Sequence, residues 1–138
     1  MTASKELKSA VRGFYEIFSS ADVDGVVAMW SKHKAALVIG TAPEEWISGY
    51  EAIAAMFKAS MPEMRGMRLV ADEVVAYAEE NVGWSADRSH FALPDGSEVP
   101  FRSTTVWRKE RGTWKLLHVH SSSGVPNEEL VGKAIPVR

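Results

Sequence analysis

The sequence predicts an α+β fold in which N-terminal helices pack against one face of a curved antiparallel sheet. Apolar residues recur with helical spacing in the first 60 residues and with a period of two from about residue 65 onward. Short polar or glycine-containing breaks, at residues 80–81, 94–96 and 110–112, divide the second half and are typical of hairpin turns. Helices followed by a meander of strands are expected to form two layers around one core.

The first segment predicts an amphipathic helix that begins after Ser4, a residue type suited to the N-cap. Leu7, Val11, Phe14 and Phe18 recur at helical spacing and therefore share one side of this helix. We expect that side to be buried and the opposite, charged side to be solvated.

Shorter elements are expected before the long strands. They are a helix over residues 23–30 capped by Asp22, a strand over 34–40, a brief strand at 46–47, and a helix from 49 that ends at Pro62. Four long strand candidates follow at residues 67–79, 82–93, 99–109 and 113–121, and residues 127–131 can form one helical turn. Strands of this length twist strongly, so the sheet should curve around a hollow in which a ligand pocket is expected.

Length and composition exclude several classes of protein. The 138 residues predict a single domain over residues 1–138, and a net charge of -2 without a basic stripe argues against nucleic acid as a partner. The absence of cysteine excludes disulfides, thiolate metal sites and cysteine nucleophiles. No apolar run approaches the ~18–20 residues of a membrane span. Charged residues interrupt the apolar residues near the N-terminus, which is not typical of a secretion signal. We therefore expect a cytoplasmic protein without a membrane partner.

Three motifs carry a family resemblance: TAPEEWISG at residues 41–49, RSTTVW at 102–107 and GTWKLLHVHS at 112–121. Together they resemble the SnoaL-like branch of the nuclear transport factor 2-like superfamily over about residues 4–124, which leaves a tail at 125–138. The closing strand is also similar to the association domain of calcium/calmodulin-dependent kinase II. The resemblance implies a cone-shaped, cystatin-like sheet wrapped around the N-terminal helices, an apolar pocket and a homodimer through the sheet.

This resemblance leaves the activity open. The superfamily includes ketosteroid isomerases, polyketide cyclases and dehydratases as well as binding and assembly modules, and a shared fold does not determine function. The kinase association domain points two arginines into its pocket, whereas the matching positions here are Thr105 and Ser121. Its anion-binding role is therefore not carried over.

His118 and His120 are the first candidates for acid–base chemistry. Residues two apart on a strand face the same way, so alternation places both histidines on the face of Trp114 and Leu116. Two imidazoles on one face can also hold a metal, but a site needs a third ligand and only His90 is available. We therefore expect no metal and no other cofactor. In the structural alternative, the two histidines only form hydrogen bonds across the hairpin.

Asp87 is the best internal carboxylate because it lies in the middle of a strand candidate. It is either a catalytic acid or base, or a surface partner of Arg88. Tyr15, beside the apolar stripe of the first helix, is the phenol expected in the cavity. Glu45 either caps the third helix or reaches the pocket mouth, and the sequence does not rank these two roles.

Alternation does not determine which face of the last strands lines the pocket. The kinase-domain resemblance favours Leu117, Val119 and Ser121 inside, with Trp107 beside them and Trp114 on the dimer face. Aromatic and small polar residues are then expected to line the pocket. The candidates for ligand binding are Tyr15, Trp30, Trp46, Phe57, Trp84, Ser103, Thr105, Trp107, Val119 and Ser121.

We expect the ligand to be a small apolar or aromatic molecule. If the protein is catalytic, the expected chemistry is a cofactor-free isomerisation, cyclisation or dehydration by acid–base catalysis. The alternative is a non-catalytic ligand-binding or oligomeric assembly module. A buried carboxylate or histidine with a shifted pKa at the pocket would favour the enzyme.

Overall fold

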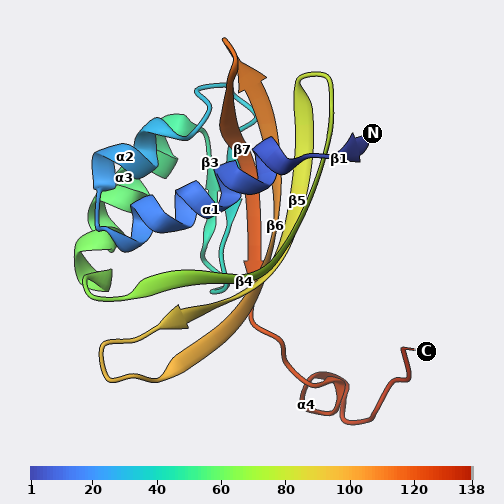
Figure 1. Ribbon diagram of the computed structural model, residues 1–138. Coiled ribbons are helices and arrows are strands. Elements are labelled where there is room, and N and C mark those ends of the chain that lie inside the picture. The colour runs from blue at the N-terminus through green and yellow to red at the C-terminus, as the bar shows by residue number, and fades with distance from the viewer. Residues whose placement is uncertain (138) are drawn as a thin grey trace.

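Three helices lie on one face of a strongly bent sheet in the computed structural model, which describes residues 1–137 (Figure 1). The helices and strands are, in chain order, β1 (Thr2–Ala3), α1 (Lys5–Ser19), α2 (Val23–Ala28), β2 (Leu37–Ile39), β3 (Trp46–Ser48), α3 (Tyr50–Ser60), a 3₁₀ turn (Met61–Met64), β4 (Arg68–Glu79), β5 (Val82–Ala92), β6 (Glu98–Glu110), β7 (Thr113–Ser122) and α4 (Asn127–Val131). The predicted α+β fold and its four long strands are confirmed.

The seven strands form one curved, unclosed sheet in the order β1-β4-β5-β6-β7-β2-β3. Neighbouring strands are antiparallel except for β2, which pairs in parallel with β7. The prediction of a wholly antiparallel sheet is therefore wrong at this one pair. A hairpin forces antiparallel pairing, but β2 follows the helices and joins β7 from a distant part of the chain.

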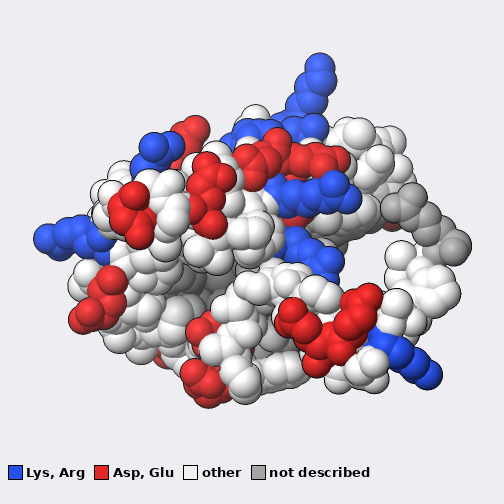
Figure 2. Space-filling view, turned by 90° about the horizontal axis from the view of Figure 1, so that it is seen from below, with Lys and Arg blue, Asp and Glu red and all other residues white. Residues whose placement is uncertain are grey.

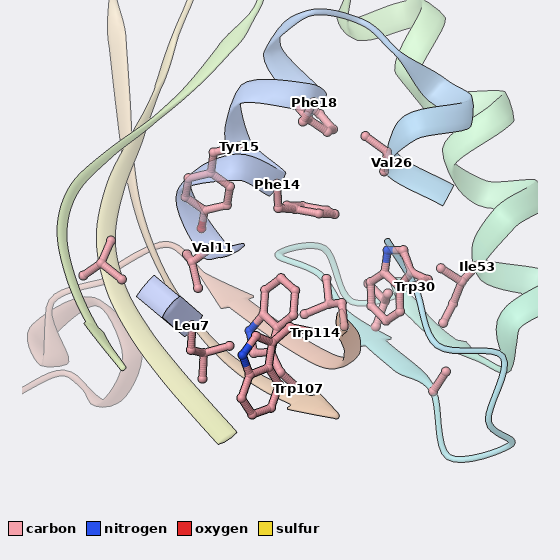
Figure 3. Packing of buried hydrophobic residues seen from close by; sticks show 14 of the residues in the cluster. Leu7, Val11, Phe14, Tyr15, Phe18, Val26, Trp30, Ile53, Trp107 and Trp114 are labelled. Carbon is pink, nitrogen blue, oxygen red and sulfur yellow. The ribbon is translucent and has the colours of Figure 1, made fainter. Parts of the chain in front are cut away.

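Helix α1 crosses the sheet with its apolar side buried, as its periodicity predicts. The Ser4 side chain accepts a hydrogen bond from the Leu7 backbone N–H at 3.1 Å, which confirms it as the N-cap. A Cβ atom at Gly83 on β5 would collide with the Leu7 side chain, so glycine permits the close approach of α1 to the sheet. Phe14, Tyr15 and Phe18 project from α1 into the interior (Figure 3).

The long strands are joined by the predicted turns. Glu79 pairs with Val82, and Glu110 pairs with Thr113, so each of these hairpins has a two-residue loop. Both residues of the second loop, Arg111 and Gly112, have positive φ angles, as a tight primed turn requires.

One bulge reverses the side-chain alternation in β7. Trp107 pairs with Leu116 and Val106 pairs with His118, which leaves Leu117 without a partner on β6. Strict alternation would place Leu116 and His118 on the same face of the sheet. Because Leu117 is an extra residue, the side chains that follow it lie on the face opposite to the one that alternation predicts. Beyond β7 the chain leaves the body, and α4 lies on the side of the sheet away from the other helices (Figure 1).

Candidate functional site

A cavity of about 320 Å³ lies between the helices and the inner face of β5, β6 and β7. Most of its wall is apolar. The lining residues are Val11, Phe14, Tyr15, Phe18, Trp30, Val38, Ile39, Gly40, Thr41, Glu45, Met56, Phe57, Ser60, Met64, Leu69, Phe91, Phe101, Ser103, Thr105, Trp107, Leu116, Val119 and Ser121.

The cavity opens beside the turn between β2 and β3. Thr41 and Glu45, both in this turn, are the exposed residues among those that line the cavity, and all others are buried or half-buried. The turn points toward the lower side of Figure 1. Figure 2, seen from that side, shows a hollowed surface with acidic side chains at its edge.

The sheet side of the cavity carries a row of buried hydroxyl groups. Ser103 and Ser121, from neighbouring strands, share a hydrogen bond of 2.6 Å. The Thr105 hydroxyl accepts a hydrogen bond from the Trp107 indole N–H at 2.6 Å and contacts the Ser85 hydroxyl. These hydroxyls form the polar wall of an otherwise apolar cavity.

Tyr15, Asp87 and Ser89 form a buried hydrogen-bonded cluster at this wall. The Tyr15 hydroxyl donates to Asp87 Oδ1 at 2.9 Å, and the Ser89 hydroxyl donates to the same oxygen at 2.5 Å. Tyr15 lines the cavity, whereas Asp87 lies behind it in the wall and is only 5% exposed. Asp87 therefore reaches the cavity through Tyr15.

The environment shifts both titratable groups of this cluster toward their protonated forms. Burial raises the pKa of Asp87, although hydrogen bonds from Ser89 and Tyr15 and the positive charge of Arg12 oppose this shift. Burial also raises the pKa of the Tyr15 phenol, and the negative charge of Asp87 adds to the increase. The Asp87 carboxylate is consequently a stronger base than an exposed one.

The second oxygen of Asp87, Oδ2, is buried and has no hydrogen-bond partner within residues 1–137. The indole N–H groups of Trp30 and Trp114 are also buried without a partner in this part of the chain, and Trp30 lines the cavity. An unpaired buried polar group costs free energy, and a bound water or ligand is one way to satisfy it.

The candidate ligand-binding residues divide into two groups. Eight of the ten line the cavity: Tyr15, Trp30, Phe57, Ser103, Thr105, Trp107, Val119 and Ser121. Placing Trp46 and Trp84 in the pocket was wrong. Trp46 is on the edge strand β3 and is 66% exposed, while its neighbour Ile47 packs inward. Trp84 is on the outer face of β5, where it stacks on Tyr77 at a ring distance of 5.3 Å.

His118 and His120 lie outside the cavity. Strict alternation placed them with Trp114 and Leu116, but the Leu117 bulge turns the histidines to the other face. His118 Nδ1 is 3.0 Å from the carbonyl oxygen of Leu37 on β2. Trp114 and Leu116 are instead part of the core, so the assignment of Trp114 to the outer face was also wrong (Figure 3).

A second hollow, of about 420 Å³, lies on the outer face of the sheet. His120 lines it together with Arg88, Arg102 and Thr104. His90 on β5 is held by Asp72, with 2.7 Å between Nδ1 and Oδ2. Within residues 1–137, the structure brings together no group of three or more metal-ligating His, Asp or Glu side chains. No helix in this part of the chain is long and apolar enough to cross a membrane.

Sequence reasoning missed Ser85 and Ser89. They flank Asp87 at alternate positions of β5, and all three are buried. This spacing of small polar residues in a strand could have indicated the cluster, because buried polar side chains need hydrogen-bond partners. Ser89 bonds to Asp87, and Ser85 bonds to Thr105 on the neighbouring strand. The alternative in which Asp87 is a surface partner of Arg88 is wrong, because Arg88 faces outward and pairs with Glu73.

A family model for the SnoaL-like domain matches residues 7–127, which confirms the resemblance inferred from the three motifs. Similar solved structures include a nuclear transport factor 2-like protein of unknown function from Pseudomonas putida KT2440. It is 19% identical, the match covers 99% of each chain, and the TM-score is 0.75. At this identity the similarity shows the fold alone.

Two further structures carry functional names. A candidate dehydratase of the nuclear transport factor 2-like family from Streptomyces avermitilis is 18% identical over 88% of this chain and 95% of that chain, with a TM-score of 0.74. A candidate calcium/calmodulin-dependent protein kinase type II association domain from Thiobacillus denitrificans is 19% identical over 86% and 94%, with a TM-score of 0.70. The comparison with curated proteins gave no match.

Proposed function

Because the chain belongs to the SnoaL-like domain family, we propose that it binds a small, mostly apolar organic molecule in the cavity and performs acid–base chemistry on an oxygen of that molecule. The observation that carries the proposal is the buried Tyr15–Asp87 hydrogen bond at the polar wall of the apolar cavity. A flat ring would pack on Phe14, Phe57 and Trp107, and its oxygen would meet the hydroxyl row.

The polar wall can both donate and accept a hydrogen bond. In the Ser103–Ser121 pair one hydroxyl donates to the other, so one hydroxyl proton stays available to a ligand oxygen. The Tyr15 oxygen donates its own proton to Asp87 and can still accept one. A ligand hydroxyl or carbonyl therefore has partners at this wall, whereas the remaining lining offers it few.

The Tyr15–Asp87 pair can move a proton to or from such an oxygen. An enol hydroxyl of the ligand gives its proton to Tyr15, and Tyr15 passes its own proton to Asp87, which leaves an enolate and a neutral carboxyl group. When Asp87 starts as the neutral acid, it gives its proton to Tyr15 while Tyr15 protonates a ligand carbonyl oxygen and a water molecule takes the adjacent C–H proton. This step yields an enol, the Asp87 carboxylate and a hydronium ion. The raised pKa of Asp87 favours this use because a buried carboxylate binds the proton more tightly.

Exchange of the α-protons of 2-tetralone in D₂O, followed by NMR, tests this chemistry. We expect the protein to accelerate exchange, and Tyr15→Phe and Asp87→Asn each to remove the acceleration while circular dichroism remains native. Binding without faster exchange would exclude the acid–base step. No binding of any flat neutral compound would contradict the whole proposal.

A non-catalytic binding module is the second candidate, and one observation favours it. Of the titratable groups predicted for the chemistry, Tyr15 alone lines the cavity within the described residues: Asp87 lies behind Tyr15, and His118 and His120 lie on the other face of the sheet. The exchange experiment separates the two candidates, because a binding module would bind 2-tetralone and leave its exchange rate unchanged.

We also propose a homodimer through the outer face of the sheet. Val75, Tyr77, Val82 and Trp84 lie there on β4 and β5, and each is between 38% and 51% exposed. Adjacent exposed apolar side chains of this kind mark interaction surfaces. Sedimentation equilibrium at micromolar concentration should give twice the chain mass, and the mass of one chain would contradict the dimer.

A further inference from the structure

Within residues 1–137, Glu45 is the one residue with a charged side chain that lines the cavity, and it lies in the turn at the mouth. Every other lining residue is apolar, a glycine, a hydroxyl-bearing residue or an aromatic. Among the described residues, no hydrogen bond or ion pair engages the Glu45 carboxylate, although Asp, Glu, Lys and Arg together make up 25% of the chain. This carboxylate is therefore available to a ligand that enters the cavity.

The backbone around Glu45 is fixed by the turn between β2 and β3. The Glu45 N–H donates to the carbonyl of Ala42 at 3.0 Å, and the Glu45 carbonyl accepts from the N–H of Gly40 at 2.8 Å. Both backbone polar groups of Glu45 are thus occupied within the turn. The side chain consequently starts from a defined position at the rim.

Gly40 allows the carboxylate to lie on the cavity side of this turn. Val38 is buried and lines the cavity, and Gly40 follows it by two residues, so a side chain at Gly40 would point the same way. A Cβ built at Gly40 would overlap the Glu45 carboxylate. The carboxylate therefore occupies the space that an inward-facing side chain at Gly40 would fill.

A negative charge at this point selects among ligands. A cation that leaves water for an apolar cavity loses hydration and needs a counter-charge, which Glu45 provides at the entrance. An anion would be repelled by the same carboxylate, and among residues 1–137 no Lys or Arg lines the cavity to receive it. Trp30, Phe14 and Phe57 in the lining suit an aromatic or alicyclic body.

From this arrangement we infer that the ligand is an amine: a flat apolar ring system that carries a protonated amino group, which pairs with Glu45 at the mouth. The inference rests on the proposed function, because it specifies the chemical class of the molecule bound in the same cavity. It assigns Glu45 a role that helix capping does not supply, since the N-cap of α3 is Gly49 and receives no side-chain hydrogen bond.

Three ligands that differ in one group provide the test: naphthylethylamine, naphthylethanol and naphthylacetate. Isothermal titration calorimetry at neutral pH and low salt should show the amine binding about fivefold more tightly than the alcohol, the scale of a partly exposed ion pair. The acetate should bind more weakly than the alcohol. Added salt should narrow the difference between amine and alcohol, because it screens an exposed pair.

Two variants locate the effect. Glu45→Gln should abolish the preference for the amine over the alcohol. Glu44→Gln is the matched control, because Glu44 carries the same charge in the same turn but does not line the cavity. It should keep the preference.

The outcomes separate this inference from the proposed function. Equal binding of all three compounds, or a preference for the amine that survives Glu45→Gln, overturns the assignment of an amine ligand while small-molecule binding stands. Failure of all three compounds to bind overturns both.

Discussion

The two faces of the strands β5, β6 and β7 differ in what covers them. The inner face of β5 presents Ser85, Asp87 and Ser89 to helix α1 and the cavity, and all three are buried. Its outer face presents Trp84, which stacks on Tyr77, contacts Met1 and stays 39% exposed, and Arg88, which pairs with Glu73. At residues 84–89 of β5 the large aromatic side chain thus lies outside and the small polar ones lie inside, whereas Phe91, further along the strand, lines the cavity.

This difference teaches that hydrophobicity alone does not identify the inner face of such a sheet. Small inward residues leave room for α1, whose apolar side chains fill the interior (Figure 3). Polar inward residues are tolerated because they bond to one another, as Ser103 does with Ser121. The inner face therefore offers polar side chains that can bond to a ligand, whereas the outer face offers exposed apolar side chains suited to contact with another surface.

Replacing tryptophans on the two faces should give the largest contrast. Trp107 is 1% exposed on the inner face, so Trp107→Ala should lower the free energy of unfolding by about 3–5 kcal/mol. Trp84 is 39% exposed, so Trp84→Ala should cost about 1 kcal/mol or less in the monomer. Urea denaturation measures both, and equal losses would mean that the two faces are not distinguished as described.

Asp87 should give the stability of the protein a distinctive pH dependence. Because burial raises its pKa in the folded state, the folded protein holds this proton more tightly than the unfolded chain. The free energy of unfolding should therefore fall as the pH rises from about 3.9 toward the raised pKa, by at most about 1.4 kcal/mol per pH unit. Asp87→Asn removes this decrease, so the variant should gain stability relative to the wild type across that range.

Asp95 is the control for this measurement, because its environment acts in the opposite direction. Hydrogen bonds from Ser97 lower the pKa of this exposed carboxyl group. The ionised Asp95 therefore stabilises the folded protein above the ordinary carboxyl pKa, and this stabilisation is lost as the pH falls. Asp95→Asn lacks it, so the variant should become less stable than the wild type as the pH rises. A difference between Asp87→Asn and the wild type that does not vary with pH would contradict the buried, titrating carboxylate.

The smallest effects are expected in ligand binding. Ser103→Ala removes a hydroxyl from the inner wall and should weaken the binding of naphthol about two- to tenfold, the net worth of one hydrogen bond. His120→Asn changes the outer face of the neighbouring strand and should leave this affinity unchanged. Calorimetric titration compares them, and a larger loss for His120→Asn would place the ligand on the outer face.

Local signals predicted the elements of this fold well. The cap at Ser4, the cap at Asp22 and hairpin turns at residues 80–81 and within 110–112 are all present, because each depends on a few neighbouring residues. The parallel pairing of β2 with β7 was not predictable in this way, since nothing near Leu37 or Ile39 identifies a partner about 80 residues away.

The sequence singled out part of the candidate site but not its geometry. Tyr15 and Asp87 were each singled out, yet their pairing at 2.9 Å joins positions 72 residues apart. The histidines were misplaced because a single unpaired residue, Leu117, shifts the alternation, and its neighbours carry no glycine or proline that would indicate a bulge.

A crystal structure of the protein with bound naphthol tests the central claim most directly. The account predicts density for the ring between the helices and the inner face of the sheet, against Phe57 and Trp107, with the ligand oxygen within hydrogen-bond distance of Tyr15 or Ser103. Density for the ligand only in the outer hollow, beside Arg102 and His120, would contradict it.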